Sequence, residues 1–95
     1  MKTHELKIDS SVFWALAAGA KTWEIRKNDR DFQVGDTVIL LETRYTGVDM
    51  LHSSKPLIYT GNKITATITY ILHGPIYGLE EGWVIMSVKE VLDAS

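Results

Sequence analysis

The chain has 95 residues, of which 45% are hydrophobic and 23% charged. This composition is typical of one ordinary globular domain over residues 1–95 and excludes a disordered, coiled-coil or collagen-like chain. Ten basic and twelve acidic side chains give a net charge of -2, so any nucleic-acid contact must be confined to a local site.

The first half of the chain predicts a strand, a helix and a second strand. Residues 3–8 alternate between apolar and polar side chains, as in a half-buried strand. The Asp-Ser-Ser sequence at residues 9–11 can cap the first turn of a helix over residues 12–18. Gly19 then stands where a left-handed residue is expected after the helix end.

Residues 22–26 alternate again and predict the next strand. If the apolar Trp23 and Ile25 enter the core, Glu24 and Arg26 share the outward face. Their charges would then lie at the helix edge or in a cleft.

The second half of the chain predicts strands joined by loops. In order, these are a loop at 27–33, a strand covered on both faces at 37–43, a loop of undetermined form at 44–54, a short strand at 57–59, a hairpin turn at 60–62, a long strand at 63–72 and a last strand at 83–90. About six strands and one helix predict a mostly β, α+β domain built as a closed or nearly closed β-barrel. One helical segment is too little to cover a parallel sheet, which disfavours a Rossmann layout.

Charged residues of both signs are dense between residues 19 and 36, and they are the candidate binding residues. Lys21, Glu24 and Arg26 can converge on one small polar ligand, with Lys27 and Arg30 nearby. An arginine can hold a phosphate or base edge with two hydrogen bonds, and a carboxylate can accept from a base amine. The alternative is a solvated ion-pair network on a barrel face.

The sequence GAKTWEIR at residues 19–26 resembles the G-x-K-x-x-E-x-R signature of ASCH domains, which belong to the PUA-like β-barrel superfamily. Nearly the whole chain resembles the DUF3850 family, most specifically over residues 4–36 and least over residues 44–56. The resemblance implies a PUA-like barrel with a cleft beside the helix, lined by Lys21, Glu24 and Arg26. It also implies RNA binding or recognition of a modified nucleoside.

The leading hypothesis is therefore a small binding module for RNA or for a modified nucleoside or nucleotide, in preference to an enzyme. The enzyme alternative has Lys21 and Glu24 as candidate catalytic residues. One ASCH branch hydrolyses N4-acetylcytidine with a Lys, a Thr and a Glu. Of these, Lys21 matches, Glu24 occupies the Thr position, and the third has no matching motif. A metal-independent ribonuclease would use Glu24 or His4 as its base with Lys21. A protein-interaction module is the third hypothesis.

The sequence predicts no metal site, because its three histidines are scattered and show no ligand spacing. No cofactor is expected. No apolar signal segment or membrane span is expected either. The sequence contains no cysteine, which excludes thiol chemistry and favours a reducing cytoplasm. A monomer is expected, while the ligand and the biological process are not determined by the sequence.

Overall fold

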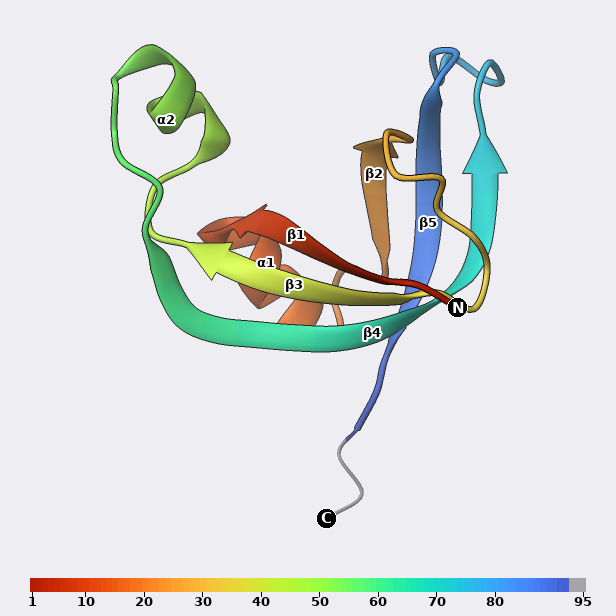
Figure 1. Cartoon of the computed structure of the whole chain (residues 1–95), viewed down its shortest axis with the longest axis horizontal. Helices are drawn as coiled ribbons and strands as arrows, with labels where there is room; N and C mark the ends of the chain where they lie inside the picture. Colours follow the sequence, from red (N-terminus) through yellow and green to blue (C-terminus); the bar gives the residue numbers. More distant parts are fainter. Residues whose placement is uncertain (93–95) are drawn as a thin grey trace.

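A computed structural model describes residues 1–92, and one strongly curled sheet forms most of the fold (Figure 1). The five strands are β1 (Thr3–Asp9), β2 (Trp23–Lys27), β3 (Thr37–Thr43), β4 (Tyr59–His73) and β5 (Trp83–Glu90). The helices are α1 (Ser10–Ala17) and α2 (Gly47–His52). The prediction of a mostly β, α+β fold is confirmed.

The sheet has the order β1-β3-β4-β5-β2, with β1 parallel to β3 and all other pairs antiparallel. The long strand β4 bends, so that its first half pairs with β3 and its second half with β5. Within residues 1–92, β1 pairs only with β3 and β2 only with β5. The prediction of a closed barrel of about six strands is wrong, because these five strands form a half-barrel with two free edges.

The expected turn at 60–62 is instead part of β4, which begins at Tyr59, so only the last residue of the expected short strand at 57–59 lies in a strand. Gly61 has a φ of 95°, a conformation that glycine adopts without strain. The side chains of Thr60 and Asn62 both donate to Glu42 of β3, at 2.7 and 3.0 Å. These polar residues therefore bind the neighbouring strand where a turn was predicted.

Helix α1 begins at Ser10, two residues earlier than predicted, and ends in a turn that positions the next strand. The Asp9 side chain does not cap α1; its Oδ1 accepts from the Gly47 N–H at 3.0 Å, which ties β1 to α2. Gly19 is left-handed, as predicted, with a φ of 75°. The N–H groups of Ala20 and Lys21 both donate to the Ala15 carbonyl. The turn that follows α1 thus fixes the position of Lys21.

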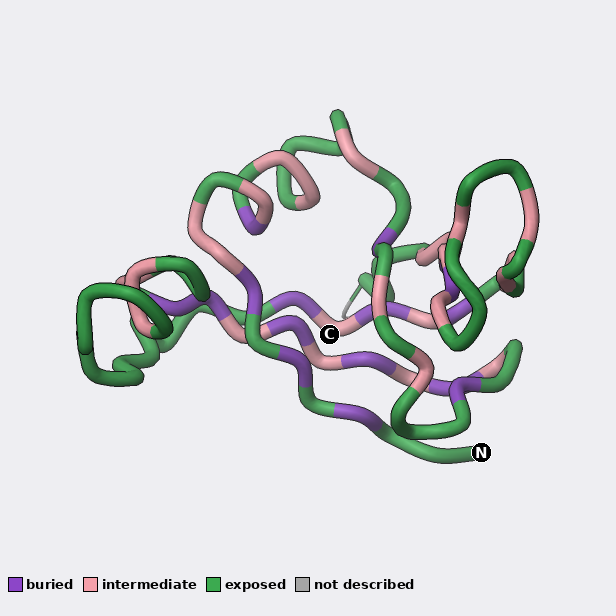
Figure 2. The backbone as a smooth tube through the Cα atoms, turned by 90° about the horizontal axis from the view of Figure 1, so that it is seen from above, coloured by how far each residue is buried: buried purple, intermediate pink, exposed green. Residues whose placement is uncertain are grey.

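The core lies on the concave face of the sheet, where alternate residues of the strands are buried (Figure 2). Its members are Leu6, Ile8, Phe13, Phe32, Val38, Leu40, Ile64, Ala66, Ile68, Val84 and Met86. Helix α1 contributes Phe13 to this cluster. Strict alternation would place Tyr70 on the buried face of β4 with Ile68, but Tyr70 is exposed, because a bulge between these two residues shifts the register.

The predicted loop at 44–54 contains the short helix α2, which stands apart from the sheet in Figure 1. Its first turn is capped by the Thr46 hydroxyl, which accepts from the Asp49 N–H at 3.0 Å. Neither described helix is long and apolar enough to cross a membrane.

Two of the buried carboxylates, Asp36 and Glu42, connect separate parts of the fold. Asp36 accepts from His4 Nε2 at 2.8 Å and from the Lys2 and Gln33 N–H groups. These hydrogen bonds, His4 foremost, lower the pKa of Asp36 to about 2 against the opposing effect of burial.

Glu42 is the second buried carboxylate, and it joins three parts of the fold. It accepts from Ser10 at the start of α1 and from Thr60 and Asn62 of β4. These hydrogen bonds lower its pKa to about 2. No basic side chain forms an ion pair with Glu42 within residues 1–92, so neutral donors balance the cost of burial.

Because the folded-state pKa values of Asp36 and Glu42 lie below their ordinary values of 3.8 and 4.5, both groups stabilise the fold above pH 4.5. That stability is lost as the pH falls from about 4.5 to about 2, where the unfolded chain binds more protons. We expect Glu42→Gln to flatten the pH dependence of the free energy of unfolding in this range, measured by urea denaturation. Glu81→Gln, at an exposed position, should keep the wild-type slope. A wild-type slope in Glu42→Gln would contradict the assignment.

Candidate functional site

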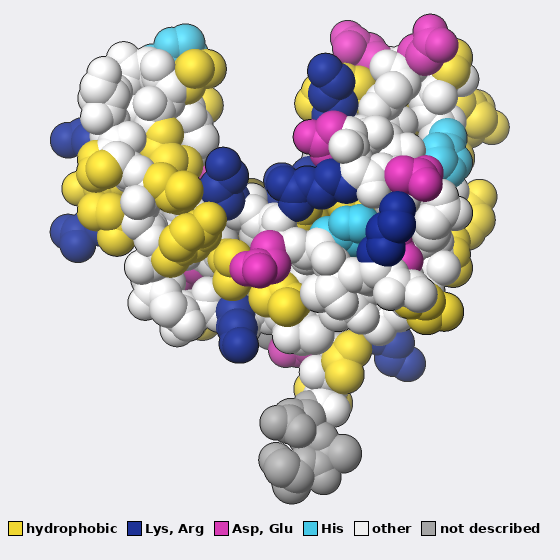
Figure 3. Space-filling view, in the orientation of Figure 1, with side chains coloured by type: hydrophobic (Ala, Val, Ile, Leu, Met, Phe, Trp, Pro, Cys, Tyr) yellow, Lys and Arg dark blue, Asp and Glu magenta, His cyan; other side chains and the backbone are white. Residues whose placement is uncertain are grey.

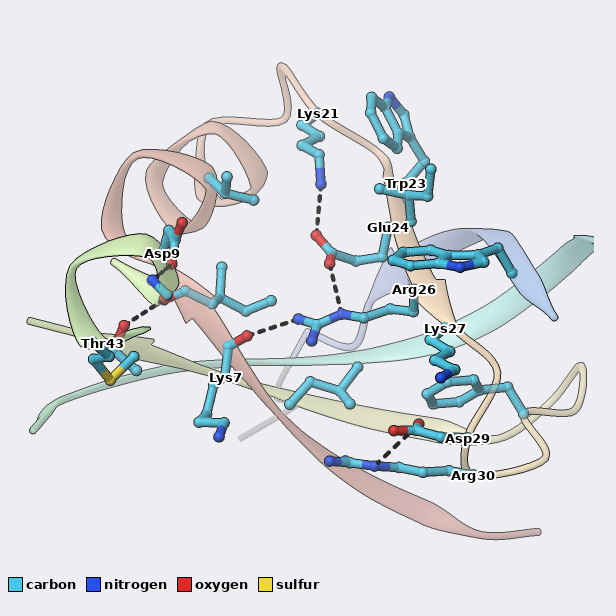
Figure 4. A pocket seen from close by; sticks show the side chains of 18 of the residues that line it. Lys7, Asp9, Lys21, Trp23, Glu24, Arg26, Lys27, Asp29, Arg30 and Thr43 are labelled. Atoms are coloured by element: carbon cyan, nitrogen blue, oxygen red, sulfur yellow. Dashed lines mark hydrogen bonds and ion pairs between the residues drawn. The ribbon is translucent and has the colours of Figure 1, made fainter. Parts of the chain in front are cut away.

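A cleft of about 900 Å³ lies where the two free edges of the sheet face each other (Figure 4). Strand β1 forms one wall and β2 with the loop after it forms the other, while α2 contributes Met50 and Leu51. The buried side chains of Leu6, Ile8 and Phe32 also line it, so the cleft reaches down to the core. Its size is within the range of small-ligand sites.

Glu24 is the central polar group of the cleft and is only 4% exposed. Its Oε1 accepts from Lys21 Nζ at 2.6 Å, and its Oε2 accepts from Arg26 Nε at 3.3 Å (Figure 4). Burying a carboxylate is costly unless charged or polar partners compensate it. The two cations supply that compensation, and the three side chains converge as predicted.

The predicted orientation of β2, however, is wrong. Glu24 faces inward, whereas Trp23 and Ile25 are 44% and 46% exposed on the other face. The alternation itself is confirmed, but the assignment of faces assumed that apolar side chains point to the core. That assumption fails here because β2 is an edge strand whose inner face lines a polar cleft.

Lys21 links the polar cluster to an exposed aromatic ring. Its ammonium group lies 4.4 Å from the centroid of the Trp23 ring, within the range of a cation–π contact. Lys21 is therefore held between the Glu24 carboxylate and the Trp23 ring. Both Lys21 and Trp23 line the cleft, and the exposed part of the ring offers a surface for stacking.

Two arginines reach across the gap between the free edges. Arg26 Nη2 donates to the Lys7 carbonyl of β1 at 2.7 Å, as Figure 4 shows. Arg30 Nη1 donates to the Glu5 carbonyl, two residues earlier on the same strand. Since alternate carbonyls of a strand point to the same side, both arginines bind the unpaired edge of β1. We refer to these two contacts as the arginine seam.

Positive charge is concentrated in the cleft although the whole chain is slightly acidic. Five basic residues line it, namely Lys7, Lys21, Arg26, Lys27 and Arg30. They stand against the three carboxylates of Asp9, Glu24 and Asp29, which leaves two positive charges in excess. Figure 3 shows Lys and Arg side chains gathered in the hollow between the two lobes of the molecule. The cleft is thus suited to an anionic ligand.

All five residues predicted to bind ligand therefore line one cleft, but other cleft residues were missed. Lys7 and Asp9 enter it because β1 is an edge strand, and Met50 enters it through α2. No spacing in the sequence indicates that β1 pairs in parallel with β3 and so leaves its other edge open. An amphipathic pattern over α2 would have been the signal for Met50, but six residues are too few to show one.

His4, named as a candidate base, is not among the residues that line the cleft. It is buried, bonded to Asp36 and packed edge-on against Phe32 at 4.8 Å between ring centroids. Among the other aromatic residues, Trp83 lines the cleft, whereas the exposed Tyr70 and Tyr77 do not. Among the described residues, no group of three or more His, Cys, Asp or Glu is placed to hold a metal ion.

The fold and the site define a small α+β domain with a half-barrel sheet and a cationic cleft between its free edges. The family model described as "Domain of unknown function (DUF3850)" matches residues 3–88, and the chain belongs to this family. It is similar to an "Uncharacterized 12.9 kDa protein in GpA 3'region" of Escherichia phage P2, with 35% identity over 68 residues. That match covers 72% of this chain and 52% of the phage protein, so the chain spans about half the length of this relative.

The geometry predicts that β2 is more sensitive to loss of its buried carboxylate than to loss of an exposed apolar side chain. Glu24→Ala leaves two cations in the cleft without their shared partner, and we expect it to lower the free energy of unfolding by about 2 kcal/mol. Ile25→Ala, at the adjacent exposed position, should cost less than about 1 kcal/mol. Urea denaturation of both variants measures the difference. Equal losses would contradict the burial of Glu24.

Proposed function

We propose that the domain binds RNA or a nucleoside-like ligand in the cleft between β1 and β2. The observation that carries this proposal is the buried Glu24 held between Lys21 and Arg26 in a cleft with excess positive charge. Buried ion pairs of this kind are weak evidence for stability alone, because apolar residues often stabilise a core as well. Their place in a cleft supports a ligand-binding role.

The cluster can form hydrogen bonds with a planar polar ligand. Each oxygen of the Glu24 carboxylate accepts one hydrogen bond and has capacity for a second, which a base amine can donate. Lys21 keeps further N–H donors beyond the one directed at Glu24. Trp23 offers a ring for stacking, a contact available to any base. Donor, acceptor and stacking surface therefore lie within three neighbouring side chains.

We further propose that the domain is an ASCH-type member of the PUA-like superfamily. The support is that the three charged residues of the G-x-K-x-x-E-x-R signature, Lys21, Glu24 and Arg26, meet in one cleft beside α1. The curled sheet, with its two edges facing each other, is also compatible with a barrel-derived fold.

Substitution of the cluster tests the binding proposal. We expect Lys21→Ala and Arg26→Ala each to abolish the NMR shift changes that a panel of ribonucleosides and a short single-stranded RNA cause in the wild type, because each removes a donor from the cleft. Lys63→Ala, an exposed cation of β4 outside the cleft, is the matched control and should bind as the wild type does. Thermal melts of all variants report folding.

Two outcomes would contradict this proposal. If both cleft variants unfold, or if the whole panel leaves Lys21, Glu24 and Arg26 unmoved, the cluster is a structural ion-pair network. Turnover of N4-acetylcytidine or of the RNA by the wild type, lost in Lys21→Ala, would instead favour the hydrolase alternative.

A cleft of this size also predicts a weak salt dependence of RNA binding. The excess charge suffices for about two or three phosphates, so the slope of log K against log salt concentration should be about -2 for a single strand. Fluorescence anisotropy of a labelled RNA between low and moderate salt measures this slope. A slope that corresponds to six or more phosphates would show an extended binding surface in place of a local cleft.

A further inference from the structure

In the arginine seam, one Nη atom of each guanidinium group donates to a neutral backbone carbonyl, while Arg26 Nε donates to Glu24. Arg26 donates to the Lys7 carbonyl and Arg30 to the Glu5 carbonyl. An arginine forms stronger, charge-assisted hydrogen bonds with an anion, and its planar fork suits the oxygens of a phosphate. A phosphate oxygen can therefore replace the backbone carbonyl as the acceptor for each guanidinium group of the seam.

The surroundings of the seam favour such an anion. Lys7 and Lys27 also line the cleft and bring two further positive charges to it. Two carboxylates oppose this charge. Glu24 Oε2 lies 3.3 Å from Arg26 Nε, and Asp29 Oδ1 lies 3.8 Å from Arg30 Nε. The side chains of Asp29 and Arg30 are substantially exposed, so their ion pair is weak and easily rearranged.

The carboxylates of Asp9 and Glu24 are already engaged. Asp9 accepts from the Gly47 N–H, and Glu24 accepts from Lys21 and Arg26 Nε. The polar groups that face the cleft thus divide into two parts. Lys21, Glu24 and the Trp23 ring lie at one end of the cluster, and the seam with Lys7 and Lys27 lies beyond Arg26 (Figure 4).

We infer that the seam is a phosphate subsite, so that the ligand is a phosphate-bearing nucleotide and not a bare nucleoside. This inference rests on the proposed function, because the base would occupy the Lys21–Glu24 end. The phosphate replaces the carbonyls of Glu5 and Lys7 as the acceptor for Arg30 and Arg26. The direct contacts between β1 and the β2 side of the cleft are thus replaced by contacts through the ligand. The phosphate can be the monoester of a free nucleotide or a diester of an RNA chain.

The exchange has a consequence that can be observed in the protein itself. The carbonyls of Glu5 and Lys7 belong to the same peptide groups as the N–H groups of Leu6 and Ile8. When these carbonyls lose their arginine donors, the amide ¹⁵N resonances of Leu6 and Ile8 should shift. A ligand without phosphate leaves the seam in place and should move these two resonances much less.

The test compares each of the four ribonucleosides with its 5′-monophosphate and with the matching dinucleoside monophosphate, by NMR titration of the full chain. We expect the phosphate to strengthen wild-type binding at least tenfold and to shift Leu6 and Ile8. A gain for the monophosphate alone assigns the subsite to a free nucleotide, and a gain for the dinucleoside alone assigns it to RNA. Either gain supports the subsite.

Substitution of Arg30 places the effect in the seam. Arg30→Gln should bring the ratio of nucleotide to nucleoside affinity close to one, and Arg30→Lys should give an intermediate ratio because it keeps the charge and loses the fork. Lys63→Gln is the control and should keep the wild-type ratio. If Arg30→Gln does not fold, the ratio of nucleotide to nucleoside affinity in the wild type and the shifts of Leu6 and Ile8 still test the phosphate subsite.

The two proposals fail in different ways. Nucleosides that bind as tightly as their nucleotides, with Leu6 and Ile8 unmoved, would overturn the phosphate subsite and leave the proposed function standing. Failure of every nucleoside, nucleotide and dinucleoside to bind would overturn both. A phosphate gain that survives in Arg30→Gln would also overturn the subsite as assigned.

Discussion

The gap between the free edges of β1 and β2 is the constraint on which the site depends. In a closed barrel these edges would pair through the backbone, which removes exposed edges altogether. Here the arginine seam spans the gap with side chains, through the carbonyls of Glu5 and Lys7. Side chains hold strands further apart than a backbone ladder does, and the space between them is the cleft.

The same gap explains why Glu24 is buried with charge around it. The inner face of β2 has no opposing strand to cover it with apolar side chains, so a carboxylate with two cationic partners occupies the position. This arrangement stabilises the fold less well than a packed apolar core could. Stability alone gives no reason to keep the Glu24 carboxylate in the cleft, whereas a role in ligand binding does. This argument is the physical basis of the proposed function.

Hydrogen bonds outside the polar cluster hold the walls of the cleft in place. Glu42 ties the start of α1 to β3 and β4, and Asp36 ties the first strand to the loop before β3. The turn after α1, with the left-handed Gly19, delivers Lys21 to the cleft. The cluster is thus mounted on elements held by their own hydrogen bonds, which limits how far a ligand must reorganise them.

Local patterns in the sequence determined the elements: the strands at 37–43 and 83–90 were predicted with the bounds of β3 and β5, Gly19 predicted the helix end, and the positions of Lys21, Glu24 and Arg26 predicted that their side chains converge. These features depend on neighbours within a few residues, which the sequence displays directly. The tertiary structure alone decided that β4 runs through Gly61, that β1 and β2 remain unpaired edges, and that Glu24 faces inward. Those outcomes depend on contacts between residues far apart in the sequence. Thr60 binds Glu42, and the two arginines of the seam bind carbonyls of β1. Local periodicity in the sequence does not indicate such contacts.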